Sequence, residues 1–147
     1  MIRHPLAVIE PGAAGRDALR LAISLAQESN GRLSCVRASR CCFPCWTVPL
    51  MVGIVATDPG AEQRLMAAAC DEVPADIPLQ TQFVSGTDRI ERQVLVVARH
   101  MRCDAIVVSE AAAWLKWRLG WPPYLVRHSW IPVLVAEHSR VPARNIT

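Results

Sequence analysis

The amino-acid sequence predicts an α/β fold with three layers, in which helices cover both faces of a mostly parallel sheet. Segments with strand character alternate with segments of helical periodicity, which is the pattern of repeated βα units. Two strand segments, Leu6–Ile9 and Ala105–Val108, are entirely apolar, as expected of parallel strands buried on both faces. The length of 147 residues fits one domain, so we expect a single domain over residues 1–147.

The first half of the chain predicts a strand, a helix, a second strand and a long loop. Leu6–Ile9 lies between proline and glycine turn signals, which favours a buried strand. Apolar residues recur at helical spacing over Asp17–Asn30, and the following glycine is a typical helix stop. Leu33–Ala38 predicts the second strand, in which Arg37 falls into the same alternating set as two apolar residues. Residues 40–58 contain prolines and no clear period, so we expect a long loop there.

The middle of the chain predicts a helix, a strand and another helix. Asp58–Glu72 begins with an N-cap residue followed by proline, which is a typical helix start. Pro78–Val84 predicts a strand, and Ser85 or Thr87 is expected to cap the helix that follows. The apolar face of that helix comprises Ile90, Val94, Val97 and Ala98.

The last predicted strand, Pro132–Ala136, follows a short helical stretch near residues 124–128. Because it comes last in the chain, we expect Val133, Leu134 and Val135 to lie on an edge strand of the sheet. An exposed apolar edge favours aggregation unless another chain covers it. These three residues are therefore the expected interface of a homodimer.

Composition and charge exclude several function classes. Apolar residues make up 52% and charged residues 20% of the chain, which excludes a disordered or collagen-like protein. The net charge of +3 is small and no run of like charges resembles a nucleic-acid-binding tail. No window reaches the roughly 18 continuous apolar residues of a membrane span. We expect a cytoplasmic protein with reduced thiols.

Ligands of parallel α/β sheets bind beyond the carboxyl ends of the strands, at the switch point of the topology. In this sequence the residues at those positions include Glu10, Ala38, Val108 and Ser109. No serine–histidine–acid or cysteine–histidine–acid spacing and no carboxylate pair accompanies them. The sequence therefore gives no reason to expect an enzyme.

Three segments, in this order, resemble the universal stress protein family. They are Leu6–Gly12 followed by Arg16–Arg20; Asn30–Val36; and Cys103–Ser109 with Gly120, Leu125–His128 and Ile131–Val135. They are similar to that family's first strand and acidic turn, its helix stop and second strand, and its last two strands with a glycine-bearing loop between them. Their order and spacing together make the resemblance fairly specific.

The resemblance implies a Rossmann-like domain with five parallel strands, and dimerisation, often through the last strand. In family members that bind ATP, an acidic residue ends the first strand, and a G-x-x-G motif followed by G-[ST] cradles the phosphates. Glycines allow backbone N–H groups to approach such an anion. By this resemblance the candidate nucleotide site comprises Glu10, Ala38, Val108, Ser109 and Gly120.

The sequence departs from the ATP-binding pattern at the phosphate cradle. Glu110 and three alanines follow Ser109, and Trp121 stands where the family has a small hydroxyl residue. Alanines favour a helix over an anion-binding nest, and Glu110 would repel phosphate. We therefore expect a regulatory or interaction protein of the stress response that binds ATP weakly or not at all. An ATP-binding member of the family is the alternative.

Cys42 and Cys45 form a C-x-x-C pair next to Cys41, which leaves three interpretations open. The thiols can be incidental, they can form a redox switch, or they can bind zinc. A zinc site needs further ligands, for which Cys35 and Cys70 are candidates. A thiol or zinc sensor is therefore the second alternative function.

Trp114, Trp117 and Trp121 lie on one face of a predicted helical segment. Tryptophan is enriched at protein interfaces. The three indoles can form a surface for an unknown protein partner, or they can cap the sheet or the dimer seam.

Overall fold

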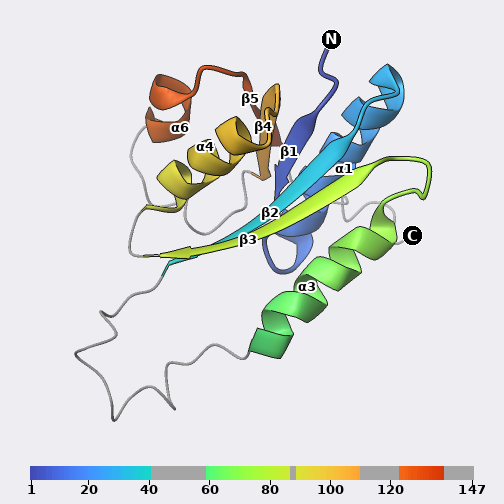
Figure 1. Cartoon of the computed structure of the whole chain (residues 1–147), viewed down its shortest axis with the longest axis horizontal. Coiled ribbons are helices and arrows are strands. Elements are labelled where there is room, and N and C mark those ends of the chain that lie inside the picture. The colour runs from blue at the N-terminus through green and yellow to red at the C-terminus, as the bar shows by residue number, and fades with distance from the viewer. Residues whose placement is uncertain (41–58, 87–88, 110–122, 138–147) are drawn as a thin grey trace, which may run out of the picture.

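The computed structural model describes residues 1–40, 59–86, 89–109 and 123–137. These residues contain a five-stranded, wholly parallel sheet with the strand order β3-β2-β1-β4-β5 (Figure 1). The strands are β1 (Pro5–Val8), β2 (Leu33–Arg40), β3 (Leu79–Gly86), β4 (Ala105–Ser109) and β5 (Val133–Ala136). The predicted α/β fold with five parallel strands is therefore confirmed.

Helices cover both faces of this sheet, as the apolar strands predicted. The helices are α1 (Ala13–Ser29), α3 (Pro59–Glu72), α4 (Ile90–His100) and α6 (Pro123–His128). Side chains from α1 and α3 pack on one face, and side chains from α4 and α6 pack on the other (Figure 1). Among the described residues, no helix has the length and apolar character that crossing a membrane requires.

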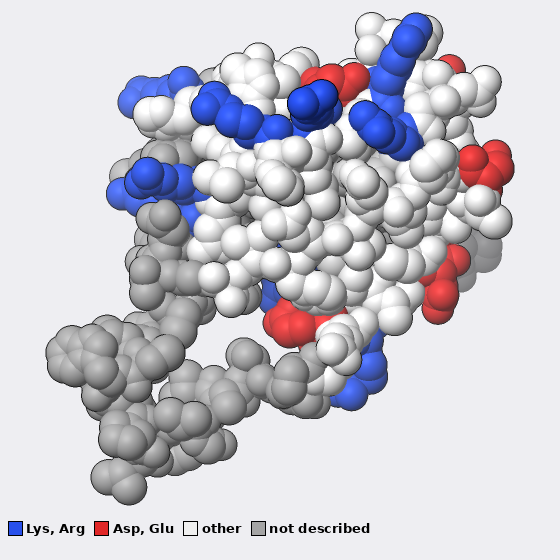
Figure 2. All heavy atoms as spheres, in the orientation of Figure 1, with Lys and Arg blue, Asp and Glu red and all other residues white. Residues whose placement is uncertain are grey.

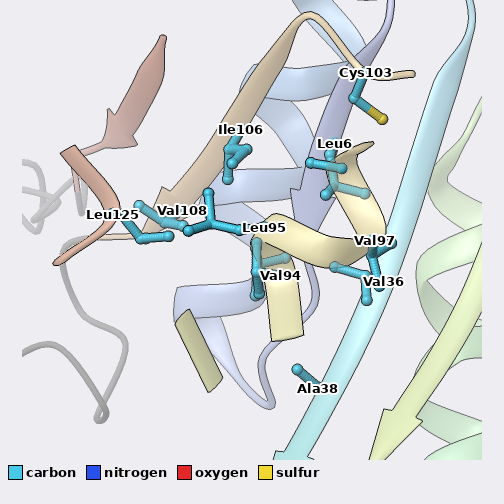
Figure 3. Close-up of a cluster of buried hydrophobic side chains, with 12 residues drawn as sticks. Leu6, Val36, Ala38, Val94, Leu95, Val97, Cys103, Ile106, Val108 and Leu125 are labelled. Carbon is cyan, nitrogen blue, oxygen red and sulfur yellow. The ribbon is translucent and has the colours of Figure 1, made fainter. Parts of the chain in front are cut away.

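Each strand supplies alternate side chains to two separate core layers. In β1, Leu6 and Val8 pack toward α4, while Ala7 packs toward α1. Figure 3 shows the α4-side layer, where side chains from three neighbouring strands converge on those of α4 and on Leu125 of α6. This period of two, with both sets buried, is why the central strands are entirely apolar.

One predicted helix start and one predicted helix cap were wrong. The first helix begins at Ala13 instead of Asp17, because Gly12 turns the chain with φ +76° directly after the strand. Ser85 does not cap α4: it lies in β3, where it pairs with Ser39, and the N-cap residue of α4 is Arg89. The other cap candidate, Thr87, lies outside the described residues.

The predicted helix stop after Asn30 is confirmed. Asn30 adopts a left-handed conformation with φ 52°, and the Gly31 N–H donates to the Ala26 carbonyl oxygen at 2.9 Å. The end of α4 has the same hydrogen-bond pattern: the Cys103 N–H donates to the Ala98 carbonyl oxygen at 2.9 Å. There the left-handed residue is Arg102, with φ 57°. Both helix ends are Schellman motifs.

The position of the last strand at an edge of the sheet is also confirmed. β5 pairs with β4 through the partners Ile106 and Val133, Val107 and Leu134, and Val108 and Val135. Val133, Leu134 and Val135 are half-buried in the single chain. Arg40, with which the predicted loop of residues 40–58 begins, ends β2 instead, and residues 41–58 lie outside the described residues.

Candidate functional site

The carboxyl ends of β2, β1 and β4 lie side by side, with β1 in the middle. From β1 the chain crosses first to β2 and later, on the other side, to β4, so the switch point of the sheet lies between β1 and β4. The structure thus brings Glu10, Ala38, Val108 and Ser109 to one end of the sheet, as predicted. Gly120 lies outside the described residues.

These four residues do not all share one layer. Ala38 and Val108 are each only 1% exposed and belong to the core under α4. Ser109 is also buried, at the end of β4. Glu10 instead contacts Arg37, whose side chain reaches Glu62 of α3 on the opposite face. Of the predicted site residues that the structure describes, Glu10 is the one that contacts a charged partner on the α3 side.

Arg37 is shared by two carboxylates at this end of the sheet. Its Nε–H donates to Glu62 Oε2 at 2.7 Å, and its Nη2 donates to Glu62 Oε1 at 3.4 Å. Its Nη1 lies 3.5 Å from Glu10 Oε2 and also donates to the Ile9 carbonyl oxygen at 3.5 Å. The forked contact with Glu62 is the geometry in which guanidinium binds carboxylate best. The group is largely removed from solvent, since 17% of the Arg37 side chain and 13% of the Glu10 side chain are exposed.

Among the described side chains, the contacts of this cluster join two carboxylates to one guanidinium, a sum of −1. An anionic phosphate that approached Glu10 would meet this negative charge in a partly desolvated environment, where charges interact more strongly than in water. The single cation of the cluster is already occupied by Glu62 and Glu10. This arrangement can orient neutral hydrogen-bonding groups, such as hydroxyls, but it disfavours phosphate.

Arg37 and Glu62 were not among the predicted site residues. The signal for Arg37 was present, because it belongs to the same alternating set as Leu33 and Cys35, which face the core. A charged side chain on a buried strand face needs a partner. The identity of that partner depends on the packing of α3 on β2, which no local pattern reveals.

A small cavity of about 130 Å³ lies next to Glu10, between α1 and α3. Its wall is apolar, with Ile9, Leu19 and Leu65, and its charged lining includes Arg16 and Glu72, which form an exposed ion pair at 3.7 Å. Sites for small molecules usually have volumes of about 300–1,000 Å³. This cavity is therefore too small to hold a nucleotide.

Gly15 determines how closely α1 approaches the end of β1. A Cβ atom at this position would lie 1.7 Å from the carbonyl oxygen of Glu10. Only glycine permits this contact between helix and turn. The position of Glu10 is thus fixed by backbone packing as well as by its ion pair.

The described cysteines do not support a metal site. Burial, together with the nearby Cys70 thiol, raises the pKa of Cys35 to about 12, and burial raises the pKa of Cys103 to about 11. Metal binding requires the thiolate, which these environments disfavour. Within residues 1–40, 59–86, 89–109 and 123–137, no group of three or more histidine, cysteine or acidic residues can hold a metal ion. Cys42 and Cys45 lie outside those ranges, as do Trp114, Trp117 and Trp121.

Comparison with solved structures shows that the fold is that of universal stress proteins. The structure of UspA from Lactobacillus plantarum has a TM-score of 0.72 and 16% identity, over 92% of this chain and 97% of that one. A family member from Burkholderia pseudomallei has a TM-score of 0.67 and 17% identity, over 91% and 95%. A member from Arabidopsis thaliana with AMP bound has a TM-score of 0.62 and 10% identity, over 92% of each chain. No family model and no curated protein matches the sequence.

Proposed function

We propose that this chain is a universal stress protein that acts by regulation or protein interaction, without catalysing a reaction and without a competent ATP site. The fold and the order of the three resembling segments support the family assignment. The Arg37 cluster supports the absence of ATP binding, because it places a net negative charge where Glu10 would meet a nucleotide. This cluster is the observation that carries the proposal.

The alternative is a member that binds an adenine nucleotide. It is favoured by Glu10, which follows the first strand by two residues, near where the resemblance places the acidic residue of ATP-binding relatives, and by the AMP-bound structure of the Arabidopsis protein. In such a site Glu10 would have to bind the nucleotide while it remained paired with Arg37. The two proposals therefore differ in whether Glu10, held by Arg37, can still contact a nucleotide.

Calorimetry with ATP and Mg²⁺ distinguishes them. We expect no ATP binding tighter than the millimolar range, and a dissociation constant in the low micromolar range would overturn the proposal. The double variant Glu10→Gln with Glu62→Gln removes both negative charges and leaves the Arg37 cation. If the cluster excludes the nucleotide, this variant binds ATP at least about 10-fold more tightly than the wild type, which corresponds to about 1.4 kcal/mol.

Glu72→Gln is the matched control for this experiment. It also removes a carboxylate near the same end of the sheet, but its partner Arg16 is exposed and it does not contact Arg37. We expect ATP binding by this variant to equal that of the wild type. An equal gain in Glu72→Gln and the double variant would mean that overall charge, and not the cluster, controls binding.

We also propose that the protein is a homodimer that pairs through β5. The supporting observation is an edge strand whose Val133, Leu134 and Val135 side chains are only half-buried in the single chain. Val133 and Val135 also pack against the α4-side core, so a charge placed there would disturb folding as well as pairing. The direct test is native mass spectrometry of the purified protein at micromolar concentration. A monomeric mass would contradict the dimer, and the same spectrum would reveal a bound nucleotide or zinc.

A further inference from the structure

A groove of about 480 Å³ lies at the opposite end of the sheet from Glu10. Its walls come from three elements: Arg32 at the start of β2, residues 80–82 of β3, and residues 100–102 at the end of α4. Figure 2 shows basic side chains gathered along the upper edge of this view, at the end of the molecule where the N-terminus lies in Figure 1. Among the described residues, the groove itself is lined by two arginines and one histidine, and by no acidic residue.

The positive charge of this groove has no acidic partner within the described part of the chain. Arg32, Arg102 and His100 line it, no acidic residue does, and neither guanidinium forms an ion pair with a described residue. The nearby Asp104 carboxylate does not line the groove: it accepts the backbone N–H groups of Arg3 at 2.7 Å and His4 at 2.9 Å, and it keeps its negative charge. An anion entering the groove would meet two available guanidinium groups.

The floor of the groove offers amide groups as well as charge. Gln80 and Gln82 stand two residues apart on β3, so they share the sheet face of Val84, which packs toward α4. Both amides line the groove. Side-chain amides both donate and accept hydrogen bonds, so they suit the hydroxyls or ring nitrogens of an organic ligand.

The backbone of Arg102 is held in a conformation that disfavours arginine. It occupies the left-handed position of the Schellman motif at the end of α4, where glycine is usual because it has no Cβ. The equivalent position of α1 holds Asn30, which adopts this conformation more readily. Residues held in unfavourable backbone conformations cluster at functional sites. The groove therefore contains an arginine whose presence the helix end itself does not explain.

We propose that this groove binds a phosphate-bearing small molecule about the size of a mononucleotide or sugar phosphate, with Arg32 and Arg102 on the phosphate and Gln80 and Gln82 on the remainder. Guanidinium groups match phosphate oxygens in a forked geometry. The volume of about 480 Å³ exceeds that of a bare phosphate and falls within the usual range for small-molecule sites. The site is separate from Glu10, so it does not depend on the function proposed above.

The test is calorimetric titration of the full chain with pyrophosphate and with AMP at low ionic strength. We expect saturable binding of both ligands in the millimolar range, which Arg32→Gln weakens and Glu10→Gln with Glu62→Gln does not. Arg32→Gln and Arg102→Gly are each expected to weaken it at least about 10-fold, as loss of one charged contact does. Arg102→Gly should at the same time raise the unfolding temperature, because glycine relieves the left-handed backbone. A variant that is more stable and binds less cannot be explained by misfolding.

Two controls locate the binding. Arg20→Gln removes an equally exposed arginine from α1, on the other face of the sheet, and should leave binding unchanged. Glu10→Gln with Glu62→Gln should also leave pyrophosphate binding at this groove unchanged. The proposal is overturned if neither ligand binds at millimolar concentration, if Arg20→Gln weakens binding as much as Arg32→Gln, or if only an acidic polymer such as polyglutamate binds.

Discussion

At the carboxyl end of the sheet, Arg37 is shared by Glu10 and Glu62, whereas at the amino end Arg32 and Arg102 have no acidic partner among the described residues. The two ends differ in the solvent exposure of their arginines as well as in charge. Arg37 is mostly buried and its partners neutralise it, while Arg32 and Arg102 are exposed. A buried guanidinium is stable only when a carboxylate or another acceptor compensates its charge, whereas an exposed guanidinium is hydrated and can bind a ligand.

This comparison separates the end where the fold class usually binds ligands from the end where this chain has uncompensated charge. Parallel α/β sheets bind ligands at the carboxyl ends of their strands. Among the described residues, that end has a negatively charged cluster next to a cavity of about 130 Å³, while the amino end has a basic groove of about 480 Å³. The fold alone therefore does not tell which end of this chain binds an anion.

The largest expected loss of stability comes from a substitution at the carboxyl end of the sheet. Gly15→Ala places a Cβ atom 1.7 Å from the Glu10 carbonyl oxygen, so α1 must move away from the end of β1. We expect a loss of about 3 kcal/mol in the free energy of unfolding, measured in urea. Gly12→Ala is the control, because its Cβ meets open space and only its φ of +76° is unfavourable, which costs about 1–2 kcal/mol. Equal losses in both variants would contradict the close packing at Gly15.

A smaller loss of stability is expected when the buried Arg37 is replaced, and the exposed Arg32 serves as the comparison. Arg37→Met removes the guanidinium that both the Glu10 and the Glu62 carboxylates contact, and we expect a loss of about 2 kcal/mol in the free energy of unfolding at pH 7. Arg32→Met removes an exposed arginine with no ion pair, and should change stability by less than about 0.5 kcal/mol. Equilibrium unfolding of the two variants tests the comparison, which fails if their losses are the same.

The pH dependence of stability probes the amino end through His4. Its side chain is buried, its Nε2 lies 2.6 Å from Ser34 Oγ, and its pKa is lowered from 6.5 first by burial and then by Arg32, against smaller raising contributions from the backbone of Arg102 and from Asp104. The neutral ring is therefore favoured in the folded state. As the pH falls below 6.5, the unfolded chain takes up a proton that the folded chain resists, so stability is lost toward low pH and is fully present above 6.5.

Arg32→Gln removes the second cause of this shift and should reduce the loss of stability between pH 7 and pH 5. His4→Gln should reduce it further, because the titrating group is gone. Urea unfolding of each variant at both pH values provides the measurement. An unchanged pH dependence in His4→Gln would show that another group is responsible.

The smallest expected effect on stability concerns Cys42 and Cys45, which lie outside the described residues. If these thiols are incidental, replacing both with serine should leave the free energy of unfolding within about 0.5 kcal/mol of the wild type. Metal analysis accompanies this measurement. One zinc per chain in the wild type and none in the double variant would favour the zinc-sensor alternative instead.

The sequence by itself determined the layers of this protein. Apolar runs such as Ala105–Val108, the helical period of α1 and the stop at Asn30 depend on residues close together in the chain, so they could be recognised without the fold. The position of Glu10 at the end of the first strand followed from the same local signals. The capping prediction at Ser85 failed because strand pairing with Ser39 extended β3 past the residue that local preference assigned to the helix.

Only the tertiary structure decided which charges are paired. Arg37 meets Glu10 and Glu62 because β2 lies next to β1 and because α3 packs on that face of the sheet, although Glu62 is 25 residues away in the chain. The basic groove likewise joins Arg32 to Arg102 through the packing of α4 against β2 and β3. Local preferences act over a few neighbouring residues, whereas the energy of a charge depends on everything that surrounds it in space.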